Sequence, residues 1–316
     1  MAELDLAALR RRLARAGVDE VAPMAGGASS LTFSGVRDGR AVVLKVAPPG
    51  VEPVAHRDIL RQARIMKALA ATQIPVPEVV VEDRESPPLF AMYRVEGDCL
   101  EPLFDGCPPT AALAELAERY RNACRTMAAL HSLSPDSLGL GGEPVVDPVA
   151  EVHRWCATLQ TVDGALVPGW QGVRDALLHH APTAMAPSVV HGDFRLGNLL
   201  ATGARINAVI DWEIWSVGDP RIDVGWFLIN SDPQTYQRVS ARVAPPQEEL
   251  AELYRQELGA RGADLAWFTA LACFKSAATW SLIVKHNRRR HSPREELEAM
   301  VPTLPRLLTR ARSMLD

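Results

Sequence analysis

The chain has 316 residues, which is long enough for two lobes around a large core, and its hydrophobic content of 47% and charged content of 23% are ordinary for a globular protein. The formal net charge of −4 gives no reason to expect a nucleic-acid partner. The five cysteines form no C-x-x-C pair, which argues against a zinc site or a disulfide framework and predicts reduced thiols in a cytoplasmic protein. No apolar run approaches the length of a membrane span and the charged start is unlike a signal peptide, so we expect no membrane partner.

The first hundred residues predict strands, then a helix, then two more strands. Apolar residues recur at helical spacing between positions 56 and 71, and two β-rich runs flank the turn Arg37–Arg40. The strand at 21–24 has the weakest pattern. In chain order we expect a helix at 4–16, strands at 21–24, 31–36 and 41–46, a helix at 56–71, and strands at 79–81 and 89–95.

The rest of the chain predicts mainly helices, interrupted by a few short strands. The sequence contains no internal repeat and no low-complexity linker, so we expect two lobes of one unit, residues 1–97 and residues 98–316. After a proline-containing connector at 98–109, the expected elements are helices at 110–131 and 149–160, separated by a loop at 132–148, then strands at 188–190, 199–200 and 208–210, and helices from 221 onward.

The most informative run is V-V-H-G-D-F-R-L-G-N-L-L, which is followed by V-I-D-W-E. It places an acid, Asp193, five residues before an amide, Asn198, and a second acid, Asp211, follows an apolar run. Phosphoryl transfer needs a carboxylate that orients the attacking hydroxyl, and oxygen ligands that hold Mg²⁺. We therefore predict Asp193 as the catalytic carboxylate and Asn198 and Asp211 as metal ligands. Glu213 either supports the metal or is an exposed loop acid, and the sequence leaves this open.

With these motifs the chain resembles the aminoglycoside-phosphotransferase superfamily of small-molecule kinases. It is similar in particular to the branch that includes the kinase domains fused to some acyl-CoA dehydrogenases. The resemblance implies an α+β, protein-kinase-like two-lobed fold: a small N-terminal lobe with an antiparallel sheet and one main helix, and a larger, mostly helical C-terminal lobe. It also implies ATP and Mg²⁺ as cofactors. The matching runs are G-G-A-S-S-L-T-F, V-L-K-V, I-P-V-P-E-V, F-A-M-Y-R-V-E-G, A-L-H-S-L, H-G-D-F-R-L-G-N-L-L, I-D-W-E and G-D-P-R-I-D-V-G-W.

The resemblance further implies a nucleotide site in residues 1–97. Lys45 ends a predicted strand and is one of four lysines among 34 basic residues, and a compact ammonium suits a phosphate contact. Glycines allow main-chain amides to approach phosphates closely, and main-chain groups at the end of the last strand of this lobe would contact adenine. The residues predicted in these roles are Gly26, Gly27, Ser29, Lys45, Met92, Tyr93 and Val95.

Gln62 is the main departure from the family pattern. The family usually has a glutamate at this place in the helix, as the partner of the strand lysine, and this chain has a glutamine. A neutral amide would hold Lys45 by a hydrogen bond instead of an ion pair. Glu52 or Asp58 could replace the missing carboxylate, and a solvated helix position is the alternative interpretation of Gln62.

Several other residues of the motifs favour structural roles. We expect His191 to hold its loop through hydrogen bonds of its ring, and Asp219 and Asp223 to anchor helix N-termini and the catalytic loop. The aromatic residues of the C-terminal part fall at partly helical spacing, which favours packing in the core over a surface that lines the substrate. These residues are Trp267, Phe268, Phe274 and Trp280.

The predicted function is an ATP- and Mg²⁺-dependent kinase that phosphorylates a hydroxyl group of a small molecule, such as a hydroxyacyl compound or another metabolite. An aminoglycoside or other antibiotic is the alternative acceptor, although the basic run Arg288–Arg290 counts against a polycationic one. A nucleotide-binding pseudokinase scaffold is the alternative of another class, because of Gln62. Neither the oligomeric state nor the choice between ATP and GTP follows from the sequence.

Overall fold

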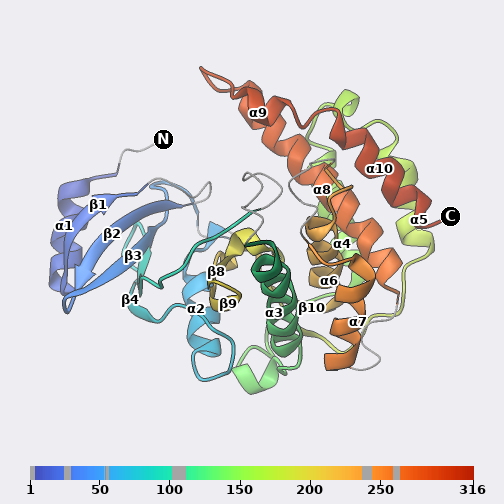
Figure 1. Cartoon of the computed structure of the whole chain (residues 1–316). Coiled ribbons are helices and arrows are strands. Elements are labelled where there is room, and N and C mark those ends of the chain that lie inside the picture. The colour runs from blue at the N-terminus through green and yellow to red at the C-terminus, as the bar shows by residue number, and fades with distance from the viewer. Residues whose placement is uncertain are drawn as a thin grey trace. The chain divides into compact units, whose positions relative to one another are not determined.

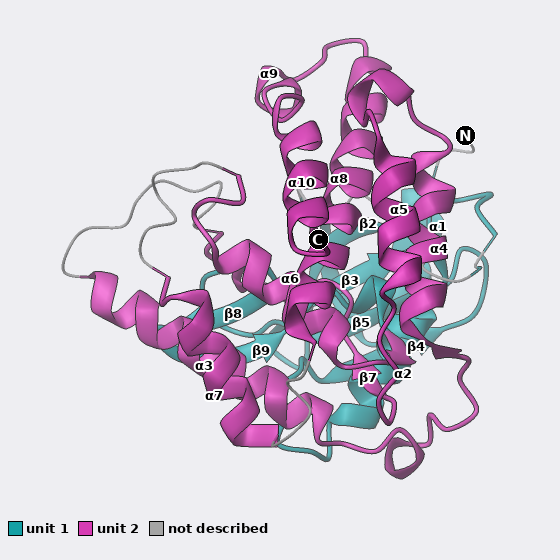
Figure 2. Ribbon diagram, turned by 90° about the vertical axis from the view of Figure 1, so that its right-hand side faces the viewer, with its two compact units in different colours: residues 1–99, 197–215 teal, residues 100–196, 216–316 magenta. Residues whose placement is uncertain are grey.

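In a computed structural model, the structure describes residues 4–24, 30–52, 54, 57–101, 112–236, 244–258 and 264–316. The chain forms two compact units, which Figure 2 shows in teal and magenta. The first unit comprises Met1–Cys99 and Gly197–Trp215, and the second comprises Leu100–Leu196 and Ser216–Asp316. The first unit therefore ends close to the predicted boundary at residue 97, but it also takes in a later segment of the chain.

The first unit is built on a five-stranded antiparallel sheet with the strand order β1-β2-β3-β5-β4 (Figure 1). Two helices accompany the sheet. α1 begins after Asp5, whose side chain accepts the N–H of Ala8 at 2.9 Å and so caps the helix. The elements are α1 (Leu6–Arg15), β1 (Val18–Pro23), β2 (Leu31–Arg37), β3 (Arg40–Val46), α2 (Leu60–Leu69), β4 (Val79–Asp83) and β5 (Leu89–Tyr93).

The turn between β2 and β3, and the alternation of buried and less buried side chains along β3, explain how the centre of this sheet forms. Asp38 and Gly39 between β2 and β3 both have positive φ, 51° and 72°, which is the conformation of a tight hairpin turn. Along β3, Val42 and Leu44 are buried and pack in one core cluster with residues of α1, while the residues between them face the other side. This alternation fixes which face of the sheet carries Lys45.

A later hairpin of the chain completes the first unit. It consists of β8 (Leu199–Thr202), β9 (Arg205–Val209) and the short 3₁₀ helix η6 (Trp212–Ile214). Asp98 and Ala201 exchange two main-chain hydrogen bonds of 2.9 and 3.0 Å. Beside them, a Cβ at Gly97 would lie 2.8 Å from the carbonyl oxygen of Ala201, and Gly97 has φ +136°. A glycine is needed where the chain leaving β5 passes this hairpin.

The second unit is mostly helical and holds a small sheet with the order β6-β10-β7. Its helices are α3 (Leu113–His131), α4 (Pro148–Leu159), α5 (Trp170–His179), α6 (Arg221–Ser231), α7 (Gln247–Leu258), α8 (Leu265–Arg288), α9 (Glu295–Glu298) and α10 (Thr303–Ser313). Its strands are β6 (Val145–Val146), β7 (Ser188–Val190) and β10 (Ser216–Gly218). Short 3₁₀ helices are η3 (Asp136–Leu138), η4 (Gly164–Leu166) and η5 (Leu196–Asn198), the last of which runs into the first unit.

Helix α8 forms the centre of the second unit. It packs against α4, α5, α6 and α10 (Figure 1). Its buried apolar side chains, from Trp267 to Val284, belong to one core cluster of the described residues. By length and apolar composition alone α8 could cross a membrane, so the expectation that no apolar run approaches this length is wrong. However, 78% of its apolar window is buried inside the structure, as in the core helix of a globular unit.

The predicted fold class is confirmed. The N-terminal part has a five-stranded antiparallel sheet with one main helix, α2, after the first three strands, and the C-terminal part is mostly helical. Two parts of the prediction were incomplete. The loop expected at 132–148 contains η3 and β6, and neither α5 nor β10 was predicted. Cys124, Cys156 and Cys273 are buried free thiols, Cys99 is exposed, and Cys107 lies outside the described residues.

Candidate active site

The candidate catalytic loop, His191–Leu196, follows β7 and is anchored by a buried carboxylate. Asp223, in the first turn of α6, accepts the main-chain N–H of His191 at 2.6 Å and that of Gly192 at 2.8 Å. Gly192 has φ +87°, so the turn that presents both amides to one carboxylate requires a residue that adopts the left-handed region easily. The ring of His131 adds a third contact to Asp223 at 3.3 Å.

The surroundings of Asp223 keep it ionised although it is fully buried. Burial raises the pKa of this carboxyl, but the hydrogen bond and charge of His131, together with His191 and its main-chain N–H, outweigh burial, and the net result is a pKa below 3.8. The expected anchoring role of Asp223 is confirmed. Asp219 likewise accepts the N–H of Arg221 at 3.0 Å, at the start of α6.

Asp193 is held in a defined orientation by three neighbours. Its main-chain N–H donates to Nδ1 of His191 at 3.1 Å, which confirms the predicted role of the histidine ring. Its carboxylate oxygen Oδ1 accepts Nε1–H of Trp226 at 2.7 Å and Nε–H of Arg195 at 3.1 Å. Arg195 also donates to Glu101 at 2.5 Å. The Asp193 side chain remains 23% exposed, so it is both oriented and accessible to a small molecule.

The hairpin β8–β9 brings the predicted metal ligands Asn198 and Asp211 together. Leu199 pairs with Val209, and the N–H of Ile210 donates to the carbonyl of Asn198 at 3.0 Å. Asn198 directly precedes β8, and Asp211 follows β9 at the same end of the hairpin. These two side chains supply amide and carboxylate oxygens, which are the donors that Mg²⁺ prefers.

The backbone at Asp211 is in the left-handed region, with φ 66° and ψ 52°. A non-glycine residue seldom adopts this conformation, although aspartate does so more readily than most. Glu213 lies in η6, two residues beyond Asp211, and is half-buried. Within the described ranges no group of three or more His, Cys, Asp or Glu side chains forms a metal site. The metal-binding role of Asn198, Asp211 and Glu213 stays a prediction.

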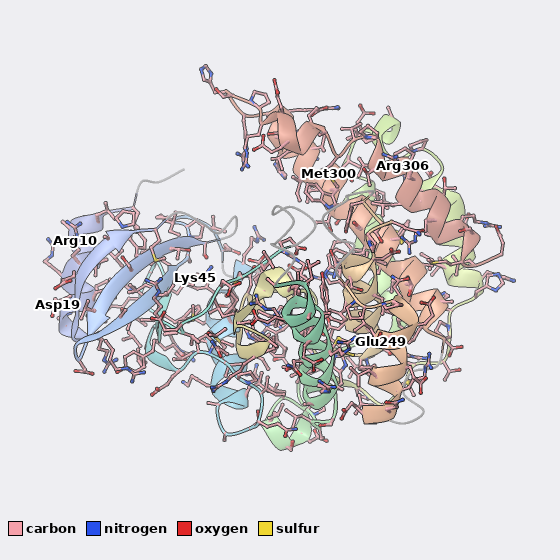
Figure 3. The ribbon with its side chains drawn as sticks, viewed as in Figure 1. Arg10, Asp19, Lys45, Glu249, Met300 and Arg306 are labelled. Atoms are coloured by element: carbon pink, nitrogen blue, oxygen red, sulfur yellow. The ribbon has the colours of Figure 1, made fainter. Side chains whose placement is uncertain are left out.

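Lys45 lies on the face of the sheet opposite the core shared with α1 (Figure 3). Thr32 is directly opposite Lys45 in the register of β2 and β3, so the two side chains share this face. The hydroxyl oxygen of Thr32 is buried, and no described residue bonds to it. Nor does any described residue form an ion pair or hydrogen bond with the Lys45 ammonium. Lys45 and Thr32 thus place a cation and a hydroxyl group on one face of the sheet.

The other predicted nucleotide contacts are placed in part. Gly26, Gly27 and Ser29 lie outside the described residues. Met92 pairs with Val43 and Lys45 pairs with Phe90, so Met92 is on the same face as Lys45. The N–H of Tyr93 donates to the carbonyl of Glu78 at 2.9 Å, so an adenine contact by Tyr93 would use its carbonyl group. Val95 lies beyond the end of β5 and is half-buried.

Gln62 lies in α2 and is only 3% exposed, which excludes a solvated helix position. No hydrogen bond joins Gln62 to Lys45 among those of the described residues, so their pairing stays a prediction. Asp58 accepts the N–H of Leu60 at 3.1 Å, at the start of α2, and its carboxylate is thus engaged there. α2 is fixed to η6 through Trp215, whose indole donates to the carbonyl of Arg61 at 3.0 Å.

Three residues around Asp193 were not predicted as part of the site: Arg195, Trp226 and Lys275. Arg195 and Trp226 are both within the runs that carry the family resemblance, and their contacts with Asp193 depend on folding. Lys275 is the only charged residue between positions 265 and 284. A lone lysine in such an apolar run could have been recognised from the sequence as a candidate functional residue. Its ammonium donates to the carbonyl of Gly192.

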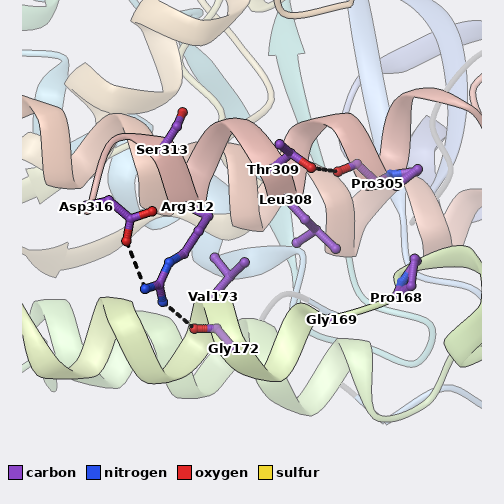
Figure 4. Close-up of a pocket in the computed structure, with 10 residues that line it drawn as sticks. All are labelled: Pro168, Gly169, Gly172, Val173, Pro305, Leu308, Thr309, Arg312, Ser313 and Asp316. Atoms are coloured by element: carbon purple, nitrogen blue, oxygen red, sulfur yellow. Dashed lines mark hydrogen bonds and ion pairs between the residues drawn. The ribbon is translucent and has the colours of Figure 1, made fainter.

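A cavity of about 560 Å³ lies between α5 and α10, and Figure 4 shows its lining. Leu308 and Val173 form its apolar part, and Arg312 bonds to Asp316 and to the carbonyl of Gly172 at its rim. None of the lining residues belongs to the catalytic loop or to the residues predicted from the sequence. This cavity therefore gives no support to a second reaction centre.

Comparison with known proteins adds the following. A profile of the phosphotransferase enzyme family (APH) matches residues 20–271. Acyl-CoA dehydrogenase family member 11 of Pongo abelii is 29% identical over 278 residues, covering 81% of this chain and 35% of that protein, so the chain spans about a third of the length of this curated relative.

Two solved structures share the fold. A Ralstonia eutropha protein, solved as a candidate aminoglycoside phosphotransferase, matches with a TM-score of 0.77 and 24% identity over 99% of this chain and 98% of that chain. A thermostable mutant of an aminoglycoside phosphotransferase, solved with ADP and hygromycin B, matches with a TM-score of 0.62 and 18% identity over 98% of both chains.

Proposed function

This chain belongs to the phosphotransferase enzyme family (APH), and from that premise we propose that it transfers the γ-phosphoryl group of ATP to a hydroxyl group of a small molecule. The observation that carries the proposal is the carboxylate of Asp193, which hydrogen bonds hold in place. Trp226 and Arg195 hold this side chain in one orientation, and the buried Asp223 anchors the main chain just before it. A fixed and accessible carboxylate is what the acceptor side of a phosphoryl transfer needs.

On the acceptor side, Asp193 orients the hydroxyl and takes its proton. The hydroxyl oxygen forms a bond to the γ-phosphorus, and the bond from the γ-phosphorus to the bridging oxygen of ATP breaks, so that ADP leaves with that electron pair. Because the protein supplies no covalent chemistry, the rate depends on position and charge. The bonds from Trp226 and Arg195 to Asp193 serve the first requirement.

On the nucleotide side, Asn198 and Asp211 would hold Mg²⁺, with Glu213 near them. The metal would neutralise charge on the phosphates of ATP. Lys45 would contact the α- and β-phosphates, a role supported by the face of the sheet that it shares with Thr32 and Met92. The loop with Gly26 and Gly27 would cover the phosphates through its main-chain amides.

We place a hydroxyacyl compound or another metabolic hydroxyl compound ahead of an aminoglycoside as the acceptor. The match to a protein named for acyl-CoA dehydrogenase supports this order. So does the run Arg288–Arg290 at the end of α8, which adds positive charge to the unit that carries Asp193.

A screen for acceptor-dependent ADP release tests the proposal. Purified protein with MgATP is mixed with a panel of hydroxyacyl compounds, other hydroxyl metabolites and aminoglycosides, and the Asp193→Ala variant is run beside it. We expect release with a member of the first two groups and none in the variant. Release with aminoglycosides alone would contradict the acceptor class. Protein that binds ATP but turns over with no acceptor, water included, would indicate a pseudokinase.

A further inference from the structure

Helix α8 carries one charged residue, Lys275, in the middle of its apolar run. Lys275 is 4% exposed, and its neighbours along the helix are buried in the core of the second unit. Removing an ammonium from water is unfavourable unless the site holds it by other contacts. A lysine in this position therefore requires an explanation beyond packing.

The Lys275 ammonium touches two parts of the structure that determine the geometry of Asp193. It donates to the main-chain carbonyl of Gly192. It also lies 4.1 Å from the centre of the Trp226 ring, and 5.4 Å from that of Trp155. Among the described residues, no carboxylate is within ion-pair distance of it. Main-chain dipole and aromatic faces, not a salt bridge, stabilise this cation.

The contact with Gly192 fixes the peptide group that precedes Asp193. The carbonyl of this peptide accepts from Lys275, and its N–H, which belongs to Asp193, donates to His191 at 3.1 Å. The peptide is thus held at both ends, so it cannot rotate without breaking one of the two bonds. The direction in which Asp193 leaves the main chain follows from this peptide.

The contact with Trp226 acts on the side chain of Asp193. One face of the Trp226 ring receives the Lys275 cation, while the indole N–H donates to Oδ1 of Asp193 at 2.7 Å. A cation on the ring withdraws electron density from it and makes the N–H a stronger donor. Lys275 therefore supports both the main-chain and the side-chain contacts of Asp193, through Gly192 and through Trp226.

We propose that Lys275 is a positioning residue that holds Asp193 in its reactive orientation through Gly192 and Trp226. The inference rests on the proposed function, because it assigns a task to Lys275 only if Asp193 orients the acceptor. It implies that an uncharged residue of similar size, which suits a buried apolar helix, would leave the fold in place and impair the reaction.

Opposing influences act on the pKa of Lys275, and the net result is a pKa below its usual value. Burial is the main cause, and Arg154 on α4 acts in the same direction. Glu151 on α4, Asp193 in the loop and Asp223 on α6 raise it. Glu151 is itself fixed by the indole of Trp155, which donates to it at 2.6 Å. These three carboxylates favour the charged form of Lys275 from beyond ion-pair distance. They therefore do not compete with the Gly192 carbonyl for the N–H groups of the ammonium.

The test compares Lys275→Met with Lys285→Met. Lys285 is on the same helix and also donates to a main-chain carbonyl, that of Thr161, so it is a matched control. ADP release from MgATP is measured with water as the acceptor, in the wild-type and in the Asp193→Ala background. We expect Lys275→Met to lower kcat on the order of 10- to 100-fold with KM for ATP within about twofold, and to add no loss in the Asp193→Ala background. Lys285→Met should match the wild type.

A second readout does not depend on turnover. The indole N–H resonance of Trp226, assigned by its absence in Trp226→Phe, should move in Lys275→Met and stay in Lys285→Met. Lys275→Arg, which keeps the charge, should retain more activity than Lys275→Met and is the fallback if the methionine variant does not fold. An unchanged kcat with an unchanged indole resonance would overturn the inference, as would the same loss of rate in both backgrounds. Turnover that survives Asp193→Ala would overturn the proposed function instead.

Discussion

Replacement of Asp223 by asparagine should lower the free energy of unfolding by about 3–5 kcal/mol. Asp223 accepts the main-chain N–H groups of His191 at 2.6 Å and Gly192 at 2.8 Å through different carboxylate oxygens. Asparagine offers one oxygen, so one of these N–H groups faces the amide NH₂ and loses its acceptor. The unsatisfied donor costs about 1–3 kcal/mol, and the two bonds that remain, including that of His131, each lose about 1 kcal/mol of charge assistance.

Urea unfolding at pH 7, followed by tryptophan fluorescence, measures this change. Asp175→Asn is the control, because the Asp175 carboxylate pairs with Arg174 at 2.7 Å but is 64% exposed. Exposed pairs contribute about 0–1 kcal/mol, so the control should stay within this range. If the two variants lose the same free energy, Asp223 does not anchor the catalytic loop in the way described.

The loss should also depend on pH. The pKa of Asp223 lies below 3.8 in the folded protein, so its carboxylate stabilises the fold fully above pH 3.8, and this contribution disappears as the pH falls through the lower folded value. The wild-type protein and Asp223→Asn should therefore differ clearly at neutral pH and converge in more acidic solution. A difference that vanishes near neutral pH would contradict the assigned direction of the shift.

Three further substitutions test the nucleotide side. Asp211→Asn should lose productive MgATP binding, measured by calorimetry with Mg²⁺ or Mn²⁺, and turnover at the wild-type rate would remove Asp211 from the metal site. Lys45→Ala should weaken ATP more than the acceptor, and a change confined to KM for the acceptor would move Lys45 out of the phosphate site. Gln62→Glu should bind ATP equally well or better, because a carboxylate in α2 can pair with Lys45 by a bond worth about 1.5–3 kcal/mol, against roughly 1 for the amide. Loss of both stability and ATP affinity in this variant would show that Gln62 does not face the ammonium.

The fold of the first unit could be predicted well because its signals are local. Two runs rich in strand-forming residues identified β2 and β3, and the segment Arg37–Arg40 identified the turn between them. The strands β6 and β10 have two and three residues, too few for any periodicity, and they exist because Val217 pairs with Val145 and Val189. Pairings between distant segments cannot be read from short runs.

Helix α5 was missed for a different reason. Trp170, Val173 and Leu177 are buried at helical spacing, but Gly172 and the preceding Gly169 interrupt the pattern. Glycine lowers helix propensity by about 1 kcal/mol relative to alanine, which makes such a short helix hard to recognise. Packing against α4, α8 and α10 supplies the stability that the local sequence lacks.

The candidate site divides in the same way. The prediction of Asp193, Asn198 and Asp211 was possible because all three lie in one short segment, at a spacing typical of kinases. Trp226 and Lys275, which support Asp193, come from α6 and α8, and the sequence around them does not show that their side chains contact the catalytic loop. Their roles follow only from helix packing that brings both side chains to Gly192 and Asp193.

The most direct test of the account is the kcat of acceptor-dependent ADP release by Asp193→Ala, measured beside its affinity for ATP. We predict a kcat lower by about 100-fold or more with little change in ATP affinity, because Asp193 orients the acceptor hydroxyl and takes its proton. An unchanged kcat with a large loss of ATP affinity would contradict the account, since Asp193 would then belong to the nucleotide site.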